Sequence, residues 1–230
     1  MSVTRSPRSA KIRPAADAVA LIQPGMTLMV GGFGLVGSPL TLIEALRTQS
    51  AADDLTIISN NLGEPGRGLG RLLLDGRVRK AVGSYFTSNP DVVRAYQEGR
   101  LEVELVPQGT LAESIRAGGA GIGGFFTKTG LGTPLSEGRE ERVIRGERYV
   151  FQEARHADVA LVRGRVADDL GNLVYSKTAR NFNPDMATAA DLVIAEVDEI
   201  VPVGGLDPEA IVTPHLFIDV LVLSPNGVCA

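Results

Sequence analysis

Short apolar runs alternate with helix-like segments over the first half of this chain, and this alternation constrains the fold more than any other feature. Apolar runs of strand length lie at residues 26–30, 55–59, 78–84 and 101–106. Helix-like segments lie at residues 15–22, 39–47, 68–74, 91–98 and 111–117. Strands that alternate with helices at this spacing form a mostly parallel sheet with helices on both faces. The predicted fold class is therefore α/β.

Residues that favour helix ends support these boundaries. Ser38 with Pro39, and Asn89 with Pro90, have the order of a capping residue followed by a first helical residue. The glycine pair at residues 118–119 is expected to close the helix at 111–117. Ligands of such sheets bind at the carboxyl ends of the strands, so the turns that follow the predicted strands are the places to search for a site.

The second half of the chain has a different pattern. Beyond Gly138, residues 142–144 and 148–151 predict a hairpin, and further buried strands are predicted at 159–162, 192–195 and 216–223. No charged linker or compositional break divides the 230 residues. We therefore expect one domain over residues 1–230, with residues 1–13 as a flexible tail. The basic, serine-containing start of that tail leaves a transit peptide as an alternative.

Composition excludes several classes of function. The formal net charge is −4, with lysines and arginines spread along the chain, so there is no basic stripe for nucleic acid. No apolar run approaches the ~20 residues that span a bilayer, and we expect a soluble, cytoplasmic protein without membrane contact. Cys229 is the single cysteine, and His156 and His215 are the two histidines, so a metal site is not expected.

A glycine-rich turn follows the first predicted strand. Residues 32–37 (GFGLVG) match the G-x-G-x-x-G pattern of dinucleotide-binding folds. Such a site also needs an acidic residue at the end of the second strand, where residues 59–61 are SNN, and Asp53 and Asp54 precede that strand. A dinucleotide is therefore disfavoured, and a glycine turn that presents backbone N–H groups at the start of a helix is the better interpretation. A tight turn without a ligand stays open.

The same turn resembles the signature of the family I coenzyme A transferases. In that signature an apolar strand leads into Gly-Gly-Phe, with a glycine and a proline a few residues later. Further blocks of the A chain of this family resemble this sequence in the same order: residues 30–39 (VGGFGLVGSP), 55–61 (LTIISNN), 106–113 (VPQGTLAE), 117–126 (AGGAGIGGFF), 129–133 (TGLGT), 171–173 (GNL) and 179–184 (ARNFNP). The sequence departs from the signature at Pro24-Gly25, where an acidic residue or Asn usually precedes the glycine.

The resemblance implies a reaction and a partner. Enzymes of this family exchange coenzyme A between an acyl-CoA and a small carboxylic acid, through a glutamyl-CoA thioester on the B subunit. This chain has no Ser-Glu-Asn-Gly-like stretch for that glutamate, and Glu113 and Glu153 are its nearest candidates. The resemblance therefore implies an A subunit in a heterotetramer with a B subunit, a three-layer architecture, and no cofactor, since the coenzyme A thioester is a substrate.

Three amide side chains are candidate catalytic residues. By resemblance, Gln108 polarises the carbonyl of the thioester or anhydride, and an amide N–H is a donor suited to an oxyanion. Asn60 and Asn61 follow the second strand and are predicted to hold the acyl carboxylate or the partner's glutamate. A turn role is the alternative for each of these residues. Residues 85–89 are predicted to lie near the acyl group.

Two glycine-rich stretches are candidate binding segments. By resemblance, the first stretch, residues 31–37, contacts coenzyme A, with shaping of the site alone as the alternative. In the second, which begins at Gly118, residues 119–121 are expected to contact the acyl group, since glycine lets the backbone approach a ligand closely. The loop at residues 118–132 is expected to line the acyl pocket, with a mobile surface loop as the alternative. The segment at 180–183 is either a site-facing turn or an interface. The candidate binding residues are Gly31, Gly32, Phe33, Gly34, Gly37, Gly119, Ala120 and Gly121.

The identity of the acid stays open at this point. The blocks are similar to those of acetate/acetoacetate (3-oxoacid) transferases, and 3-oxoadipate transferases share nearly all of them. A sugar-phosphate isomerase or sensor domain of similar architecture is an alternative from another class, but it needs acidic residues or a lysine placed for proton transfer. The third possible function is that of a non-catalytic binding module.

Overall fold

A seven-stranded parallel sheet forms the centre of the molecule, in a computed structural model that describes residues 11–225. The strand order is β13-β11-β8-β1-β2-β3-β4, and every neighbouring pair is parallel. The strands are β1 Thr27–Val30, β2 Leu55–Ile58, β3 Val78–Gly83, β4 Glu102–Leu105, β8 Ala157–Arg163, β11 Ala190–Val197 and β13 Val220–Leu223. The predicted α/β class with a mostly parallel sheet is confirmed.

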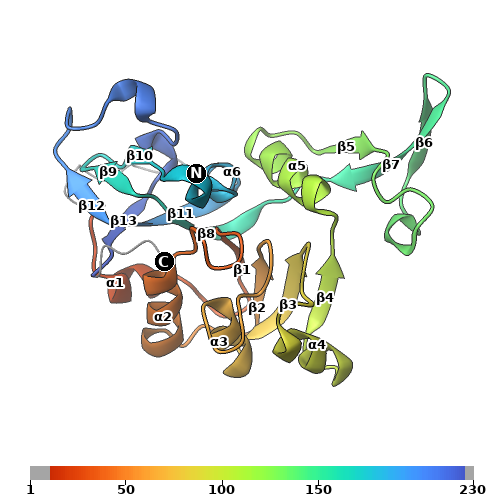
Figure 1. The fold of residues 1–230 in the computed structure, drawn as a ribbon, viewed down its shortest axis with the longest axis horizontal. Coiled ribbons are helices and arrows are strands. Elements are labelled where there is room, and N and C mark those ends of the chain that lie inside the picture. Colours follow the sequence, from red (N-terminus) through yellow and green to blue (C-terminus); the bar gives the residue numbers. More distant parts are fainter. Residues whose placement is uncertain (1–10, 226–230) are drawn as a thin grey trace.

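Helices cover both faces of this sheet (Figure 1). Side chains of α1 to α4 pack in one apolar cluster with Leu28 of β1, and those of α5 and α6 pack in a second cluster with its neighbour Met29. Successive residues of a strand point to opposite faces, so a parallel sheet that is covered twice needs continuous apolar strands. The helices are α1 Ala15–Val19, α2 Leu40–Gln49, α3 Leu69–Leu74, α4 Pro90–Gln97, α5 Gln108–Gly119 and α6 Asn183–Met186.

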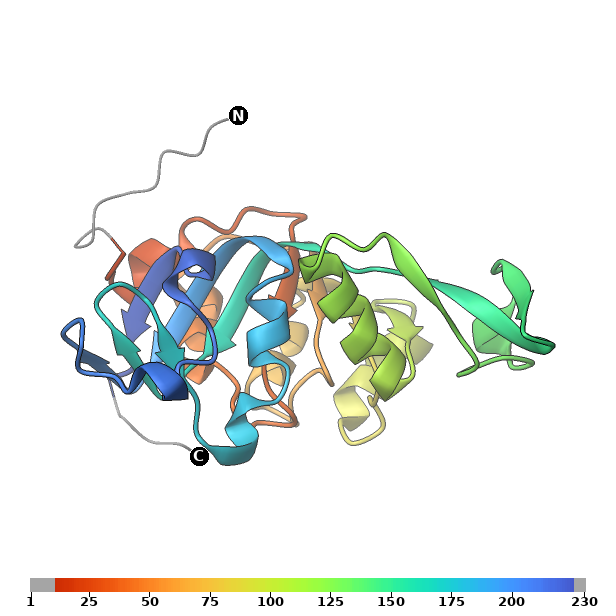
Figure 2. The ribbon, with the colours of Figure 1, turned by 90° about the horizontal axis from the view of Figure 1, so that it is seen from above.

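Two small sheets flank the central one. The first contains β9 Val166–Asp168, β10 Leu173–Val174 and β12 Glu199–Val201. The second contains β5 Gly124–Thr127, β6 Glu141–Ile144 and β7 Glu147–Glu153. It extends away from the body as an arm, residues 124–153, beyond the β4 edge (Figures 1 and 2). Short 3-10 segments lie at Pro134–Ser136, Lys177–Arg180, Pro208–Ala210 and His215–Phe217.

The predicted elements agree with the structure in order and differ at some ends. The hairpin expected around residues 145–147 is present, and Arg145 and Gly146 have φ values of 51° and 81° at its turn. The helix expected at 111–117 begins three residues earlier and continues through the glycine pair 118–119 that was expected to close it. Residues 216–223 were expected to form one strand, but a 3-10 segment occupies their beginning and the strand starts at Val220.

The expected flexible tail lies only partly within the described residues. Residues 1–10, and Cys229, lie outside them. Residues 11–13 run along the outer side of β13, where Leu221 donates its N–H to Lys11 O (2.8 Å) and Arg13 donates its N–H to Leu221 O (2.9 Å). This part of the predicted tail is therefore bound to the edge of the sheet. No helix within residues 11–225 is long and apolar enough to cross a membrane.

Candidate active site

Three polar side chains meet at the carboxyl edge of the central sheet. Asn60 follows β2, Ser84 follows β3, and Gln108 begins α5 after β4. Asn60 Nδ2 lies 2.9 Å from Gln108 Oε1 and 3.1 Å from Ser84 Oγ. Because parallel strands end at one edge, residues far apart in the sequence come together here. The sequence pattern predicted Asn60 and Gln108 at this edge but missed Ser84, which the same rule identifies when it is applied to β3.

The amide of Gln108 has a fixed orientation. Its Oε1 accepts hydrogen bonds from Asn60 Nδ2 and from the Ser84 hydroxyl. The side chain is exposed, and its Nε2 has no hydrogen-bond partner within residues 11–225. Two donors on the oxygen leave both N–H groups of the amide directed away from the cluster. The arrangement therefore presents a neutral hydrogen-bond donor, of the kind that stabilises negative charge developing on a carbonyl oxygen.

The two candidate asparagines differ in their contacts. Asn60 is almost completely buried and joins the cluster, and its main-chain oxygen also accepts the N–H groups of Ser84 (3.0 Å) and Tyr85 (3.2 Å). Asn61 accepts the N–H of Gly63 at 3.2 Å through its Oδ1, which closes the turn after β2. Tyr85 lies beside the cluster, but Asn89 at the other end of the 85–89 stretch caps α4. The structure brings Asn60, and not Asn61, into contact with Gln108.

The first glycine stretch forms a tight turn beside this cluster. Phe33 and Val36 pair across it: the distance from Phe33 N to Val36 O is 3.0 Å, and that from Val36 N to Phe33 O is 3.3 Å. Gly32, Gly34 and Gly37 have φ values of 125°, 62° and 70°, which side-chain-bearing residues rarely adopt. The N–H of Gly34 points to Asn60 Oδ1 at 3.4 Å. This contact joins the turn to the cluster of Asn60, Ser84 and Gln108, which we call the amide cluster.

Two asparagines from the far end of the chain hold this turn in place. Asn181 Oδ1 accepts the N–H of Gly32 at 3.0 Å, and Asn181 Nδ2 donates to Val36 O at 2.9 Å. Asn183 Nδ2 donates to Gly37 O at 3.0 Å. A Cβ at Gly31 would lie 1.8 Å from Asn183 Oδ1, so glycine is required there for space. The 180–183 segment, which the sequence left as a site-facing turn or an interface, is therefore a support for the glycine turn.

The second glycine stretch is not the continuous loop that we expected. Gly118 and Gly119 lie inside α5, Ala120 is its C-cap, and Gly124 begins β5. Gln108 is the first residue of the same helix, so roughly 16 Å of helix separates it from Gly119 at 1.5 Å per residue. Residues 119–121 are thus not brought together with the amide cluster, and their role in acyl binding stays a prediction.

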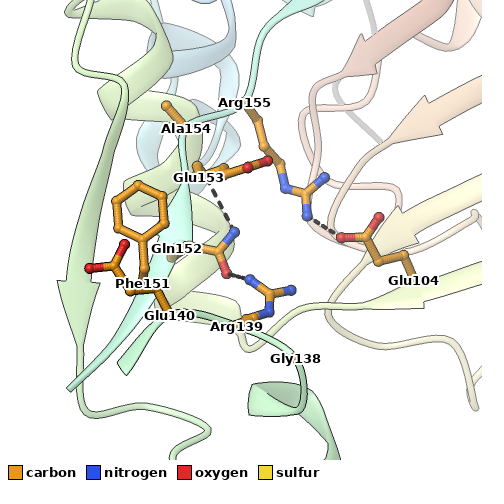
Figure 3. A pocket seen from close by; sticks show the side chains of 9 residues that line it. All are labelled: Glu104, Gly138, Arg139, Glu140, Phe151, Gln152, Glu153, Ala154 and Arg155. Atoms are coloured by element: carbon orange, nitrogen blue, oxygen red, sulfur yellow. Dashed lines mark hydrogen bonds and ion pairs between the residues drawn. The ribbon is translucent and has the colours of Figure 1, made fainter. Parts of the chain in front are cut away.

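A cavity of about 570 Å³ lies elsewhere, between the β4 edge and the root of the arm (Figure 3). Arg155 forms an ion pair there with Glu104, which also pairs with Lys80 at 3.2 Å. Burial by itself would raise the pKa of Glu104, but Arg155 and Lys80 outweigh it and hold that pKa below its ordinary value. None of the candidate amides or candidate binding residues lines this cavity. It is an ionic junction between arm and body.

The candidate carboxylates of this chain lie apart from the amide cluster. Glu113 forms an exposed ion pair with Arg116 at 2.7 Å, and the hydrogen bond from Arg116 lowers the pKa of Glu113. Glu153 lines the cavity at the root of the arm. In the described part of the chain, no carboxylate accepts a hydrogen bond from the side chain of Asn60, Ser84 or Gln108. Residues 11–225 also contain no group of His, Cys, Asp and Glu side chains that could hold a metal ion.

Comparison with known proteins gives consistent matches along almost the whole chain. The family model described as Coenzyme A transferase matches residues 12–224. The A subunit of the succinyl-CoA:3-ketoacid coenzyme A transferase of Xanthomonas campestris is 50% identical over 221 residues, which cover 94% of this chain and 91% of that protein. The A subunit of the 3-oxoadipate CoA-transferase of Pseudomonas putida is 50% identical over 217 residues, which cover 94% and 93%.

A solved structure shares the fold at lower identity. The acyl-CoA transferase of E. coli O157:H7, in a thioester complex with CoA, superposes with a TM-score of 0.85 at 22% identity. The match covers 97% of this chain and 49% of the other, so this chain spans about half the length of that protein.

Proposed function

Because this chain belongs to the coenzyme A transferase family, we propose that it is the A subunit of a two-subunit enzyme. The enzyme moves coenzyme A between an acyl-CoA and a short-chain 3-oxo acid or other carboxylic acid. The observation that carries the proposal is the Gln108 amide, whose oxygen is held by Asn60 and Ser84 while its N–H groups are presented at the ligand-binding edge of the sheet. Two relatives at 50% identity, each named as the A subunit of such an enzyme, support the assignment.

The proposed first step is attack of a partner carboxylate on the thioester. The carboxylate oxygen bonds to the acyl carbon, the C–S bond breaks, and coenzyme A leaves as the thiolate, so that a mixed anhydride remains. During attack the thioester oxygen gains negative charge, and Gln108 Nε2 donates a hydrogen bond to it. Electrostatic stabilisation of this kind acts on the transition state more than on the bound substrate, so it raises turnover.

A mixed anhydride has two carbonyl carbons. In the second step the thiolate attacks the one that comes from the partner's carboxylate. The C–S bond of a glutamyl-CoA thioester forms, and the original acyl group leaves as a free carboxylate. A second acid then repeats the two steps in reverse order and takes up coenzyme A. The covalent intermediate divides one difficult exchange into easier ones.

The nucleophile is proposed to come from another chain. Glu113 is paired with Arg116, Glu153 lies at the root of the arm, and neither is hydrogen-bonded to the Gln108 amide within the described residues. This chain matches only about half of the E. coli transferase, which supports a second chain that corresponds to the other half. We propose that a B subunit supplies the carboxylate and that the two chains form a heterotetramer. The cytoplasmic location expected from the sequence stays a prediction.

The acid is not distinguished by the relatives. A succinyl-CoA:3-ketoacid enzyme and a 3-oxoadipate enzyme each share 50% identity with this chain. We propose a short-chain 3-oxo acid such as acetoacetate, with 3-oxoadipate as the alternative. Initial rates of the assembled enzyme with acetoacetate and with 3-oxoadipate, at equal succinyl-CoA, distinguish the two.

The test of the function compares the chain alone with the chain mixed with a B subunit. The chain alone is expected to give no thioester exchange, and the mixture is expected to be active. Gln108→Ala in the mixture should slow formation of the glutamyl-CoA thioester about a hundredfold, or about 3 kcal/mol. Gln108→Glu should be at least as harmful, because it adds negative charge beside the developing oxyanion.

The matched control is Gln97→Ala, which removes an exposed amide at the end of α4, away from the cluster. Robust exchange by the chain alone would overturn the proposal of a partner nucleophile. Formation of the intermediate at the wild-type rate by assembled Gln108→Ala would show that Gln108 is a turn residue.

A further inference from the structure

The helix that follows the glycine turn lacks a side-chain cap of its own. α2 begins at Leu40, and its N-cap is Pro39, which has no side chain that can accept a hydrogen bond. Ser38, expected from the sequence to cap this helix, makes no side-chain cap contact, and only its main-chain oxygen binds the N–H of Leu40 at 2.9 Å. The first amides of a helix have no partner within the helix and need an acceptor from elsewhere.

A buried glutamate on a distant strand supplies that acceptor. Glu196 Oε2 accepts the N–H of Leu42 at 3.0 Å, although the two residues are 154 positions apart. Leu42 is the third residue of α2, the position whose N–H an N-cap side chain binds. Glu196 is completely buried, and a carboxylate at a helix N-terminus is favoured by the helix dipole. The cap of α2 is therefore built by the tertiary fold.

An arginine pairs with this glutamate at the same edge of the sheet. Arg163 pairs with Glu196 and with Asp198. Arg163 and Glu196 are direct neighbours in the register of β8 and β11, so the two strands hold their side chains together. A buried carboxylate is tolerated when it is paired and hydrogen-bonded, and Glu196 has both an ionic partner and a helix amide.

The same cluster also reaches the end of the glycine turn. The N–H of Arg163 donates to Asn183 Oδ1 at 2.8 Å, and Asn183 Nδ2 donates to Gly37 O at 3.0 Å. Gly37 and Leu42 are thus tied to one buried cluster at two points that are five residues apart. Between these points the chain passes from the glycine turn into α2.

We propose that Glu196 is a positioning residue for the ligand-binding turn at residues 31–37. It acts by fixing the start of α2, while Arg163 and Asn183 fix the end of the turn. The backbone N–H groups of the turn are then held in place before any ligand arrives, which lowers the ordering cost of binding. The effect on acyl-CoA binding rests on the proposed function, whereas the effect on the turn does not.

The experiment uses Glu196→Met, Glu196→Gln and a control, Glu44→Gln. Glu44 is on α2 as well, but it pairs on the surface with Arg47 and Arg71. In the full chain, amide hydrogen exchange over residues 32–42 should be about tenfold faster in Glu196→Met, while exchange in β1 and β2 stays unchanged. Glu196→Gln keeps an oxygen for Leu42 and should change this exchange by less than about threefold.

Binding is measured in the enzyme assembled with its B subunit. Glu196→Met should raise the KM for acyl-CoA about fivefold with kcat nearly unchanged, and Glu196→Gln should restore most of the affinity. Unchanged exchange at residues 32–42 in a folded Glu196→Met variant, or equally faster exchange throughout the sheet, would overturn the proposal. Faster local exchange with an unchanged KM would also overturn it. If the wild-type assembly transfers no coenzyme A, the proposed function fails, and the exchange data still decide how Glu196 acts on the turn.

Discussion

The two glycine-rich stretches of this chain have similar composition and different structures. The first, residues 31–37, is a turn in which Gly32, Gly34 and Gly37 have positive φ values. The second begins inside a helix, where Gly118 and Gly119 have ordinary helical backbone, and continues into a strand of the arm. Glycine is needed at these three positions of the first for its backbone conformation, whereas Gly118 and Gly119 of the second are needed for space, since an added Cβ would clash at either.

The neighbours of each stretch explain the difference. Side-chain amides of Asn60, Asn181 and Asn183 surround the first, so its backbone groups have fixed partners around an open tip. Main-chain and side-chain atoms of the protein pack closely against the second. A Cβ at Gly118, for example, would lie 1.9 Å from the main-chain oxygen of Arg155. Glycine content therefore indicates close approach of atoms, but it does not tell whether the approaching atoms belong to a ligand or to the protein itself.

The largest expected effect is that of Gly118→Ala. The added methyl group would meet the carbonyl of Arg155, and a main-chain atom cannot move aside without displacing β7 from α5. We expect a loss of about 3 kcal/mol or more in the free energy of unfolding. Denaturant unfolding of the purified chain measures it. A variant as stable as the wild type would show that this part of the second stretch is not closely packed.

A smaller loss is expected when the support of the first stretch is removed. Asn181→Gly keeps the positive φ of 22° at this position but removes the amide that binds Gly32 and Val36. We expect about 2 kcal/mol of lost stability, because the N–H of the buried residue Gly32 loses its acceptor and the oxygen of Val36 loses one of its two donors. Denaturant unfolding measures the loss in the free energy of unfolding, and faster hydrogen exchange of the Gly32 N–H would show that the turn is the part affected. Unchanged exchange at Gly32 would mean that the turn holds its shape without Asn181.

The two stretches should also differ in their response to acid. The second is anchored near Arg155, whose partner Glu104 has a pKa held below its ordinary value. The side chains that bind the first directly are amides, which do not titrate in this range, and Glu196 acts on it only through α2 and Arg163. The stabilisation from Glu104 is present above the ordinary pKa of 4.5 and is lost as the pH falls through the lowered value. The difference in Tm between wild type and Glu104→Gln should therefore be largest near neutral pH and shrink below pH 4.5.

A difference in Tm that is independent of pH would show that Glu104 acts through packing. Asn181→Gly serves as the control, since its effect on Tm should be the same at both ends of the pH range.

The smallest effect is expected for Gly123→Ala. This glycine belongs to the second stretch, but no atom lies within 4 Å of the position of an added Cβ, and its φ is not in the left-handed range. We expect a change of less than about 0.5 kcal/mol in stability and unchanged activity in the assembled enzyme. A large loss of activity without a loss of stability would instead indicate that a ligand or a partner chain approaches this residue.

Much of the fold follows from local patterns. The apolar runs of β1 to β4, and the Asn89-Pro90 start of α4, identify their elements from neighbouring residues alone. The arm hairpin is similarly determined by its turn residues. Helix ends are less well defined by such patterns: α5 continues through two glycines, which are glycines because Arg155 and Thr188 leave no space for a Cβ there.

Predictions for the site divide in the same way. Asn60 was identified because it follows a strand, and Gln108 because it follows a strand within a block that resembles the family's A chain; parallel strands end at one edge. The bond between them, and the part of Ser84 in orienting Gln108, depend on the distances between strands that only the folded chain fixes.

The sequence by itself determined the order of strands and helices, the glycine turn and the family signature, since these depend on residues that are close in the chain. The tertiary structure alone decided which distant residues complete each local feature. Glu196 caps a helix that begins 156 positions earlier in the chain, and Asn181 holds a turn 149 residues away. Their hydrogen bonds have no local signal, because the partners meet only when burial of the apolar strands brings them to one edge of the sheet.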